Sequence, residues 1–395
     1  MGFFLRWGSR DVTSGRGACP RRESALSWKS SLAYNPSCGF AGVLGRSRPA
    51  WRERMGVPPR RPWRRRILVL TAALVAAWLA VSFAVAYRLT RRPRPMAEEP
   101  LPQAFAGEAV SVRLTTRDGE ELGAWFLPGR PGSPMVVLLH GHGACRGACV
   151  EQAQLLREAG CPTLLVTLRG HGDSTGEVID FGLSARRDVV AAVEWLGERH
   201  PGRDVVVWGQ SLGSAAALFA AEPLGRGVRG YILECPFADL RTAVWNRLRQ
   251  RLPAPLDVAA YAGLIAVSPL VLPDLDRIAP REAAAGVPEG TPVLILAGGR
   301  DERARPDEAR AIAGRVRPEA EVVVFDDGDH VQLSRENPRR YREVVTAYLR
   351  RFASTGETRA GVNVWVCVPI FAPMWIWKYL RPSPAVTPPS PPEAT

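Results

Sequence analysis

Residues Val205 to Ala217 read V-V-V-W-G-Q-S-L-G-S-A-A-A, and this stretch decides the fold of the chain. Its apolar, β-branched start predicts a buried parallel strand, and its alanine-rich end predicts a helix. Between them lies a G-x-S-x-G turn, the pattern that presents a serine nucleophile on a sharp bend whose glycines allow close packing. The competing interpretation is an ordinary Gly/Ser turn, and the flanking strand and helix favour Ser211 as a nucleophile.

The rest of the chain alternates short apolar runs with helical patterns. A hairpin is predicted over residues 110–115 and 121–127, and further strands over 135–139, 163–168, 230–233, 292–297 and 321–325. Helices are predicted over residues 148–159, 184–199, 306–316 and 339–352. This alternation predicts an α/β fold with a doubly wound, mostly parallel sheet. Residues 240–285 are rich in Leu, Ala and Pro, look helical and show no strand pattern.

A serine nucleophile needs a general base and an acid that orients it. Four of the five histidines precede Ser211 in the sequence, and only His330 follows it, directly after the last predicted strand. His330 is therefore the predicted base. Asp301 follows the preceding strand and is the predicted acid, with Glu302 and Asp239 as alternatives. Function collects at the carboxyl ends of the strands in such sheets, which is where all three predicted residues lie.

Two backbone N–H groups are needed to bind the oxyanion of a tetrahedral intermediate. One is predicted at Leu212, directly after the nucleophile. The other is predicted at His142, in the glycine-containing loop H-G-H-G that follows the strand over 135–139. His140, His142 and His171 could be imagined as metal ligands, but no carboxylate or cysteine completes a set, so we expect neither a metal nor a cofactor.

The chain of 395 residues carries a net charge of +13, which is unevenly distributed. Residues 1–66 hold 15 Lys and Arg against 3 Asp and Glu, whereas residues 96–395 hold 33 against 36. The body of the protein is therefore close to neutral. No basic patch interleaved with aromatic residues is present, and we expect no nucleic-acid partner.

The basic excess flanks Ile67–Tyr87, 21 residues without charge that would form a helix of about 31 Å, enough to cross a bilayer. Seven arginines lie between residues 52 and 66, and four lie between residues 88 and 94. The positive-inside rule then predicts a cytoplasmic N-terminus and an extracytoplasmic body. A cleaved signal peptide, ending at Ala84-Val85-Ala86, is the alternative and would release a secreted protein.

The predicted organisation follows from these patterns. Residues 1–66 form a disordered basic region, 67–87 the anchor, 88–107 a Pro-rich linker, 108–353 the folded domain, and 354–395 a tail. The apolar, tryptophan-rich part of the tail, Val362–Leu380, is predicted either to lie at a membrane interface or to pack on the body. Cys145 and Cys149 could pair in an oxidising compartment.

The ordered motifs H-G-H-G, R-G-H-G-D-S, G-Q-S-L-G, G-G-R-D-E and G-D-H resemble the α/β-hydrolase superfamily over residues 108–353. The chain is most similar to the branch with serine-aminopeptidase-like and acyl-esterase-like members, which often carry an N-terminal membrane anchor. The resemblance implies Ser211, Asp301 and His330 as a catalytic triad, and Leu212 and His142 as oxyanion donors. It also implies a helical cap over residues 240–285. One departure is the acid loop, R-D-E-R-A-R-P, which is more polar than in many relatives.

The sequence therefore predicts a membrane-anchored serine hydrolase that cleaves a small-molecule carboxylic ester, with an apolar acyl group or a small lipid as substrate. Members of this fold also cleave amides, peptides and thioesters, which remain alternatives. A third interpretation is a membrane-tethered binding domain without turnover. A fourth, a structural membrane protein with two spans, rests on Val362–Leu380.

Overall fold

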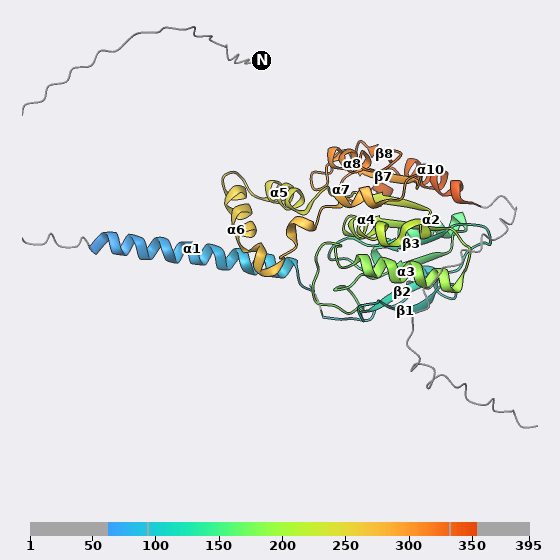
Figure 1. The fold of residues 1–395 in the computed structure, drawn as a ribbon, viewed down its shortest axis with the longest axis horizontal. Helices are drawn as coiled ribbons and strands as arrows, with labels where there is room; N and C mark the ends of the chain where they lie inside the picture. Colours follow the sequence, from blue (N-terminus) through green and yellow to red (C-terminus); the bar gives the residue numbers. More distant parts are fainter. Residues whose placement is uncertain (1–61, 93–94, 332, 354–395) are drawn as a thin grey trace, which may run out of the picture. The chain divides into compact units, whose positions relative to one another are not determined.

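The computed structural model describes residues 62–92, 95–331 and 333–353 of the chain, with the elements labelled in Figure 1. The predicted basic region over residues 1–66 falls almost wholly outside these residues. So does the segment Val362–Leu380, for which both predictions stay open.

Eight strands form one sheet in the order β1-β2-β4-β3-β5-β6-β7-β8. The first two pairings are antiparallel and the other five are parallel. The strands are β1 (Val110–Thr115), β2 (Glu121–Leu127), β3 (Met135–Leu139), β4 (Thr163–Val166), β5 (Val205–Gln210), β6 (Gly230–Glu234), β7 (Val293–Gly298) and β8 (Glu321–Phe325). The predicted mostly parallel α/β sheet is confirmed, and its strand boundaries differ from the predicted ones by at most two residues.

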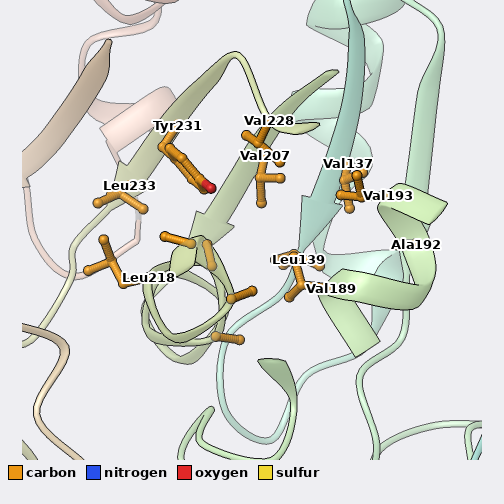
Figure 2. Close-up of a cluster of buried hydrophobic side chains, with 14 of the residues drawn as sticks. Val137, Leu139, Val189, Ala192, Val193, Val207, Leu218, Val228, Tyr231 and Leu233 are labelled. Atoms are coloured by element: carbon orange, nitrogen blue, oxygen red, sulfur yellow. The ribbon is translucent and has the colours of Figure 1, made fainter. Parts of the chain in front are cut away.

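Alternating side chains of the central strands bury opposite faces of the sheet. Val137 and Leu139 of β3 point into one apolar cluster, which Figure 2 shows together with residues of α3 (Arg186–Arg199) and α4 (Leu212–Leu224). Val136 and Leu138 point into the other cluster, which contains residues of α2 (Val150–Ala159) and α10 (Pro338–Leu349). Burial on both faces explains why these strands read as continuous apolar runs rather than alternating ones.

The two layers of helices complete the domain around the sheet (Figure 1). Helix α8 (Pro306–Ala313) joins α3 and α4 in the first cluster through Ala309 and Ile312. A short 3-10 helix, Arg146–Cys149, precedes α2, where the sequence predicted a single helix beginning at residue 148. Cys145 and Cys149 are free thiols in this structure.

The segment between β6 and β7 forms a helical insertion, as predicted. It begins with α5 (Leu240–Arg251) and α6 (Leu256–Val271), and ends with the short helix α7 (Pro280–Ala283). The carboxylate of Asp239 caps α5 by accepting a hydrogen bond from the backbone N–H of Thr242. The insertion therefore starts immediately beyond the strand that follows the Ser211 turn, over the carboxyl edge of the sheet.

Helix α1 (Pro62–Leu89) contains the predicted anchor and is longer than predicted. An 18-residue window of Trp63–Leu89 has a mean hydropathy of 2.4, and this helix is long and apolar enough to cross a membrane. Among the described residues, only the second half of α1 is buried in part against the rest of the protein. There, Trp78 Nε1–H donates to the carbonyl oxygen of Ala259 in α6 at 3.2 Å.

Candidate active site

Ser211 lies in a strained turn between β5 and α4. Its φ is +50°, in a region that residues with a side chain rarely adopt. Such a backbone angle persists mainly where the surrounding structure enforces it. A β-carbon added to Gly209 would lie 2.3 Å from the carbonyl of Gly213, and one added to Gly213 would lie 2.5 Å from the carbonyl oxygen of Leu139. Both glycines of the G-x-S-x-G motif are therefore required by backbone that approaches too closely for any side chain.

Gly213→Ala is expected to destabilise the protein by about 1–3 kcal/mol, because the new methyl group must displace the backbone of β3. The matched control is Gly197→Ala on α3, where a β-carbon meets nothing within 4 Å. This control should be neutral or stabilise by up to about 1 kcal/mol, as alanine favours the helix. Chemical denaturation in detergent measures both free energies of unfolding. Equal effects at the two positions would contradict the account of the turn.

The structure brings Ser211, His330 and Asp301 together in one hydrogen-bonded chain. His330 Nε2 lies 3.1 Å from Ser211 Oγ, and His330 Nδ1 lies 2.7 Å from Asp301 Oδ2. These residues follow β5, β8 and β7, three strands that end at the same edge of the sheet. With Nδ1–H donated to the carboxylate, Nε2 is left as the acceptor for the serine hydroxyl. This arrangement suits proton transfer from serine to imidazole.

Asp301, rather than either alternative acid, faces His330. Its side chain is fully buried, and Oδ1 accepts hydrogen bonds from the backbone N–H groups of Arg303 and Ala304 at 2.8 and 3.0 Å. Glu302 points to solvent, and Asp239 is occupied as the cap of α5. The two backbone donors fix the carboxylate so that Oδ2 remains aimed at the imidazole.

The two predicted oxyanion donors flank the serine. The loop that carries His142 approaches Ser211 closely, since a β-carbon added to Gly141 would lie 3.7 Å from Ser211 Cβ. Within the described residues, the backbone N–H groups of His142 and Leu212 have no hydrogen-bond acceptor. Two unpaired donors beside a nucleophile can bind the negative oxygen of a tetrahedral intermediate.

His142 also contacts the end of the apolar helix. Its ring stacks on Phe181 with centroids 5.1 Å apart, and Nε2–H donates to the carbonyl oxygen of Leu89 at 3.0 Å. Burial lowers the pKa of His142, which favours the neutral ring. The loop His140–Gly143, which carries the predicted oxyanion donor and is called the oxyanion loop below, is therefore held directly against the last turn of α1.

His140 and His171 brace this loop rather than reach the serine. His140 Nε2 accepts from the backbone N–H of Leu168 at 3.0 Å, and His171 Nε2 accepts from that of Gly143 at 3.1 Å. Each ring donates Nδ1–H to a carbonyl oxygen, of Gly141 and Arg169 respectively, so each is held in one neutral tautomer. Burial lowers their pKa values to about 3 for His140 and about 4 for His171.

The rings of His140 and His171 are expected to remain neutral as the pH falls from about 8 to 5.5, because a lowered pKa delays protonation until lower pH. The measurement is NMR of the protein labelled with ¹³C in its histidine rings, with signals assigned from single His→Gln variants. Neither assigned signal should move over this range. A titration midpoint near the unperturbed value of 6.5 for either ring would contradict its buried, hydrogen-bonded position.

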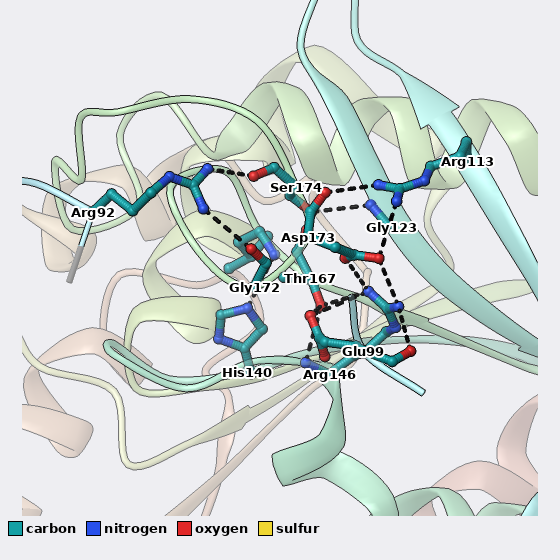
Figure 3. Close-up of polar contacts among 11 residues, drawn as sticks. Arg92, Glu99, Arg113, Gly123, His140, Arg146, Thr167, Gly172, Asp173 and Ser174 are labelled. Carbon is teal, nitrogen blue, oxygen red and sulfur yellow. Dashed lines mark hydrogen bonds and ion pairs between the residues drawn. The ribbon is translucent and has the colours of Figure 1, made fainter. Parts of the chain in front are cut away.

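A second polar cluster lies behind the oxyanion loop and is drawn in Figure 3. The guanidinium of Arg146 is 2% exposed, contacts both carboxylate oxygens of Asp173 at 2.5 and 3.0 Å, and lies 3.2 Å from Glu99. It also donates to the hydroxyl of Thr167 and lies over the ring of Trp125 at 4.6 Å. This cluster fixes the chain immediately after the loop of His142.

The linker after α1 takes part in the same cluster. Arg92 donates to the carbonyl oxygens of Gly172, Ser174 and Gly176, and Glu99 pairs with Arg146 (Figure 3). No sequence pattern predicts these contacts, because a Pro-rich linker has no periodicity that indicates a partner. The motif R-G-H-G-D-S did mark Asp173, but not the arginine that pairs with it.

Cys235, Asp301 and His330 are the one group of described residues whose ligand atoms are close enough to hold a metal ion, within 4.8 Å of one another. Asp301 and His330 already hydrogen-bond to each other, and burial raises the pKa of the Cys235 thiol well above its ordinary value. Because a thiol binds metal as its thiolate, this donor set fits a metal poorly.

Comparison with known proteins gives consistent matches. The family model "Serine aminopeptidase, S33" matches residues 131–261. The human protein ABHD12B is 36% identical over 122 residues, 30% of this chain and 33% of its own length. The zebrafish lysophosphatidylserine lipase ABHD12 is 29% identical over 113 residues, 27% of this chain and 29% of its own length. The chain thus spans about a third of the length of these curated relatives.

Among solved structures, an esterase from Pyrococcus furiosus, Pf2001, superposes with a TM-score of 0.56. It is 22% identical, and the match covers 68% of this chain and all of the esterase chain. At this identity the likeness concerns the fold alone.

Proposed function

Because the chain belongs to the α/β-hydrolase superfamily, in its serine-aminopeptidase-like branch, we propose that it is a serine hydrolase of carboxylic esters. The observation that carries the proposal is the hydrogen-bonded chain from Ser211 Oγ through His330 to the buried Asp301. Neither a metal nor a cofactor takes part in the proposed reaction.

In the proposed mechanism, His330 Nε2 takes the proton of Ser211 as Oγ attacks the ester carbonyl carbon. The backbone N–H groups of Leu212 and His142 bind the oxyanion that forms. His330 then gives the proton to the departing alcohol, leaving an acyl group on Ser211. A water molecule, deprotonated by His330, attacks the carbonyl carbon of this acyl group. The bond to Ser211 Oγ then breaks, His330 returns the proton to Oγ, and the carboxylic acid leaves. Asp301 stabilises the imidazolium in both steps.

An apolar acyl group or a small lipid is the proposed substrate class. The side chains of the insertion and the site form one apolar cluster, in which Phe237, Leu240 and Val267 lie with Phe181, the residue stacked on His142. These side chains are buried or partly buried against one another, so the site is bordered by apolar packing, and such surroundings suit an acyl chain better than a peptide. The name of the zebrafish relative, a lysophosphatidylserine lipase, agrees with a lipid substrate.

A membrane-anchored location is also proposed, on the properties of α1. Helix α1 has the length and composition of a membrane span, and its end contacts the oxyanion loop. The arginine distribution favours a cytoplasmic N-terminus with the hydrolase domain outside. Release by a signal peptidase near Ala86 is the alternative, and it would separate the domain from the helix that contacts it.

Kinetics of the full-length protein in detergent micelles test the substrate class. The panel holds p-nitrophenyl esters of increasing acyl length, lysophospholipids and aminoacyl p-nitroanilides. Esters and lysophospholipids are expected to be hydrolysed with kcat/KM at least about 100-fold above that of the anilides. Faster cleavage of the anilides would favour a peptidase, and a folded protein that turns over nothing would favour a binding domain.

A further inference from the structure

We propose that cap helix α6 docks into the lipid interface of the bilayer that α1 crosses, with arginines at the end of α5 on anionic headgroups. The inference rests on the proposed membrane anchor of the previous subsection. It adds a second membrane contact, made by the insertion that covers the site.

The exposed face of α6 is entirely apolar. Its solvent-facing residues include Leu256, Val258 and Leu270, with exposed fractions of 56%, 53% and 75%. The others are alanines and a proline, at positions 259, 262, 266 and 269. The one charged residue of the helix, Asp257, is buried and accepts a hydrogen bond from the backbone N–H of Val258. A wholly apolar helix face in contact with water is costly, so a covering partner is expected.

Contacts with α1 place α6 at the depth of lipid. Trp78 bonds to Ala259, and a β-carbon added to Gly263 would lie 2.2 Å from Ser82 Oγ, so the two helices touch closely. Both contacts fall inside the charge-free stretch Ile67–Tyr87. From Trp78 to its end this stretch measures about 15 Å, half of a bilayer core of about 30 Å. If α1 crosses the bilayer, a helix packed beside these residues lies at or within the interface.

Positive charge gathers next to the apolar face. Arg247, Arg249 and Arg251, in the last turns of α5, are exposed and form no ion pair with any described residue. Helices α5 and α6 lie side by side (Figure 1). They pack together through Trp245 and Tyr261, whose ring centroids are 5.2 Å apart. Unpaired arginines beside an apolar helix face complement a membrane surface that contains anionic lipid.

Docking here would place the site beside the bilayer. Val267 and Val271 of α6 share an apolar cluster with Ala86 of α1, and with Leu183 and Ala215 beside the Ser211 turn. The surface of α6 that meets lipid would therefore be separated from the Ser211 turn by one packed apolar cluster.

Depth-sensitive fluorescence on the full-length protein tests the proposal. The variants Val258→Cys, Leu270→Cys, Leu74→Cys and Ala347→Cys, each with one added cysteine, are labelled with an environment-sensitive NBD dye. The unsubstituted protein, labelled in the same way, gives the background from the native cysteines. The protein is reconstituted into phosphatidylcholine vesicles with about a quarter phosphatidylserine, with and without nitroxide-bearing lipid. Leu74, on α1, reports the anchor, and Ala347, exposed on α10, reports a surface in water.

Lipid nitroxide is expected to quench the labels at residues 258 and 270 about threefold more than the label at 347, as for a helix inserted in the interface. Replacing Arg249 and Arg251 together by glutamine should lower this quenching about twofold in vesicles with phosphatidylserine, but not in pure phosphatidylcholine. Arg339→Gln on α10 is the matched control and should leave the quenching unchanged.

Three results would overturn the inference. If only the label at 74 is quenched, the anchor stands and the docking of α6 fails. If neither α1 nor α6 is quenched, the membrane anchor itself fails. If the α6 labels emit as in an apolar environment without quenching by lipid, protein covers this face, either Val362–Leu380 of the same chain or a second copy. None of these readouts depends on turnover, so they do not test the hydrolase itself.

Discussion

Replacing Asp301 by asparagine is expected to lower kcat for ester hydrolysis by about 10³- to 10⁴-fold. Asparagine keeps the size of the side chain but offers an amide in place of the carboxylate oxygen that accepts His330 Nδ1–H at 2.7 Å. The imidazole then loses the partner that holds Nε2 as an acceptor, and the imidazolium formed during attack loses its counter-charge. KM should change little, because Asp301 is buried behind His330 and does not reach substrate.

The neighbouring residue supplies the control for this prediction. Glu302→Gln removes the same charge from an exposed carboxylate beside the site, and kcat should stay within about twofold of wild type. Steady-state kinetics with a soluble p-nitrophenyl ester measure both variants. A large loss with Glu302→Gln and a small one with Asp301→Asn would show that the acid was assigned to the wrong residue.

Arg146→Met is expected to destabilise the protein by about 3–5 kcal/mol, the cost of removing the buried guanidinium that pairs with Glu99 and Asp173. Methionine retains most of the apolar stem over Trp125, so the loss comes from the charge rather than from packing. Glu99 would lose this guanidinium, and Asp173 would keep only its ion pair with the half-exposed Arg113 at 3.2 Å. Because the cluster supports the loop of His142, activity should fall along with stability.

Two further variants separate charge from volume in this prediction. Adding Asp173→Asn to Arg146→Met removes the charge of one of the two carboxylates that pair with Arg146, and should recover part of the lost stability. Arg351→Met breaks an exposed ion pair with Glu321 and should cost at most about 1 kcal/mol. Denaturant unfolding in detergent measures all three. If Arg146→Met lowers the free energy of unfolding by less than about 1 kcal/mol, the buried ion pairs of Arg146 contribute little to stability.

The central strands could be predicted closely because they are buried on both faces. Met135–Leu139 and the partly buried edge strand Glu321–Phe325 both have matching boundaries in the structure, because turn residues end the apolar pattern on both sides. The residues around Ser211 were predictable for a different reason. A strained turn admits only glycine at Gly209 and Gly213, and one histidine follows the serine in the sequence.

The contacts around the oxyanion loop could not be predicted in this way. Glu99 and Arg146 are 47 residues apart and lie in segments without periodicity, so nothing in the sequence pairs them. The same is true of Trp78 and Ala259, 181 residues apart, which join α1 to the insertion. His140 and His171 were identified only as metal ligands to be excluded. Their bracing hydrogen bonds depend on how two loops meet, which local patterns do not encode.

Labelling with a fluorophosphonate probe tests the central claim most directly, because the probe forms a covalent bond only with a serine that is activated as a nucleophile. The full-length protein and Ser211→Ala would be labelled in parallel, and the modified peptide identified by mass spectrometry. We predict one label per chain on Ser211 of the wild type, and none on the folded alanine variant. A folded wild-type protein that takes no label, or that is labelled at another serine, would contradict the account.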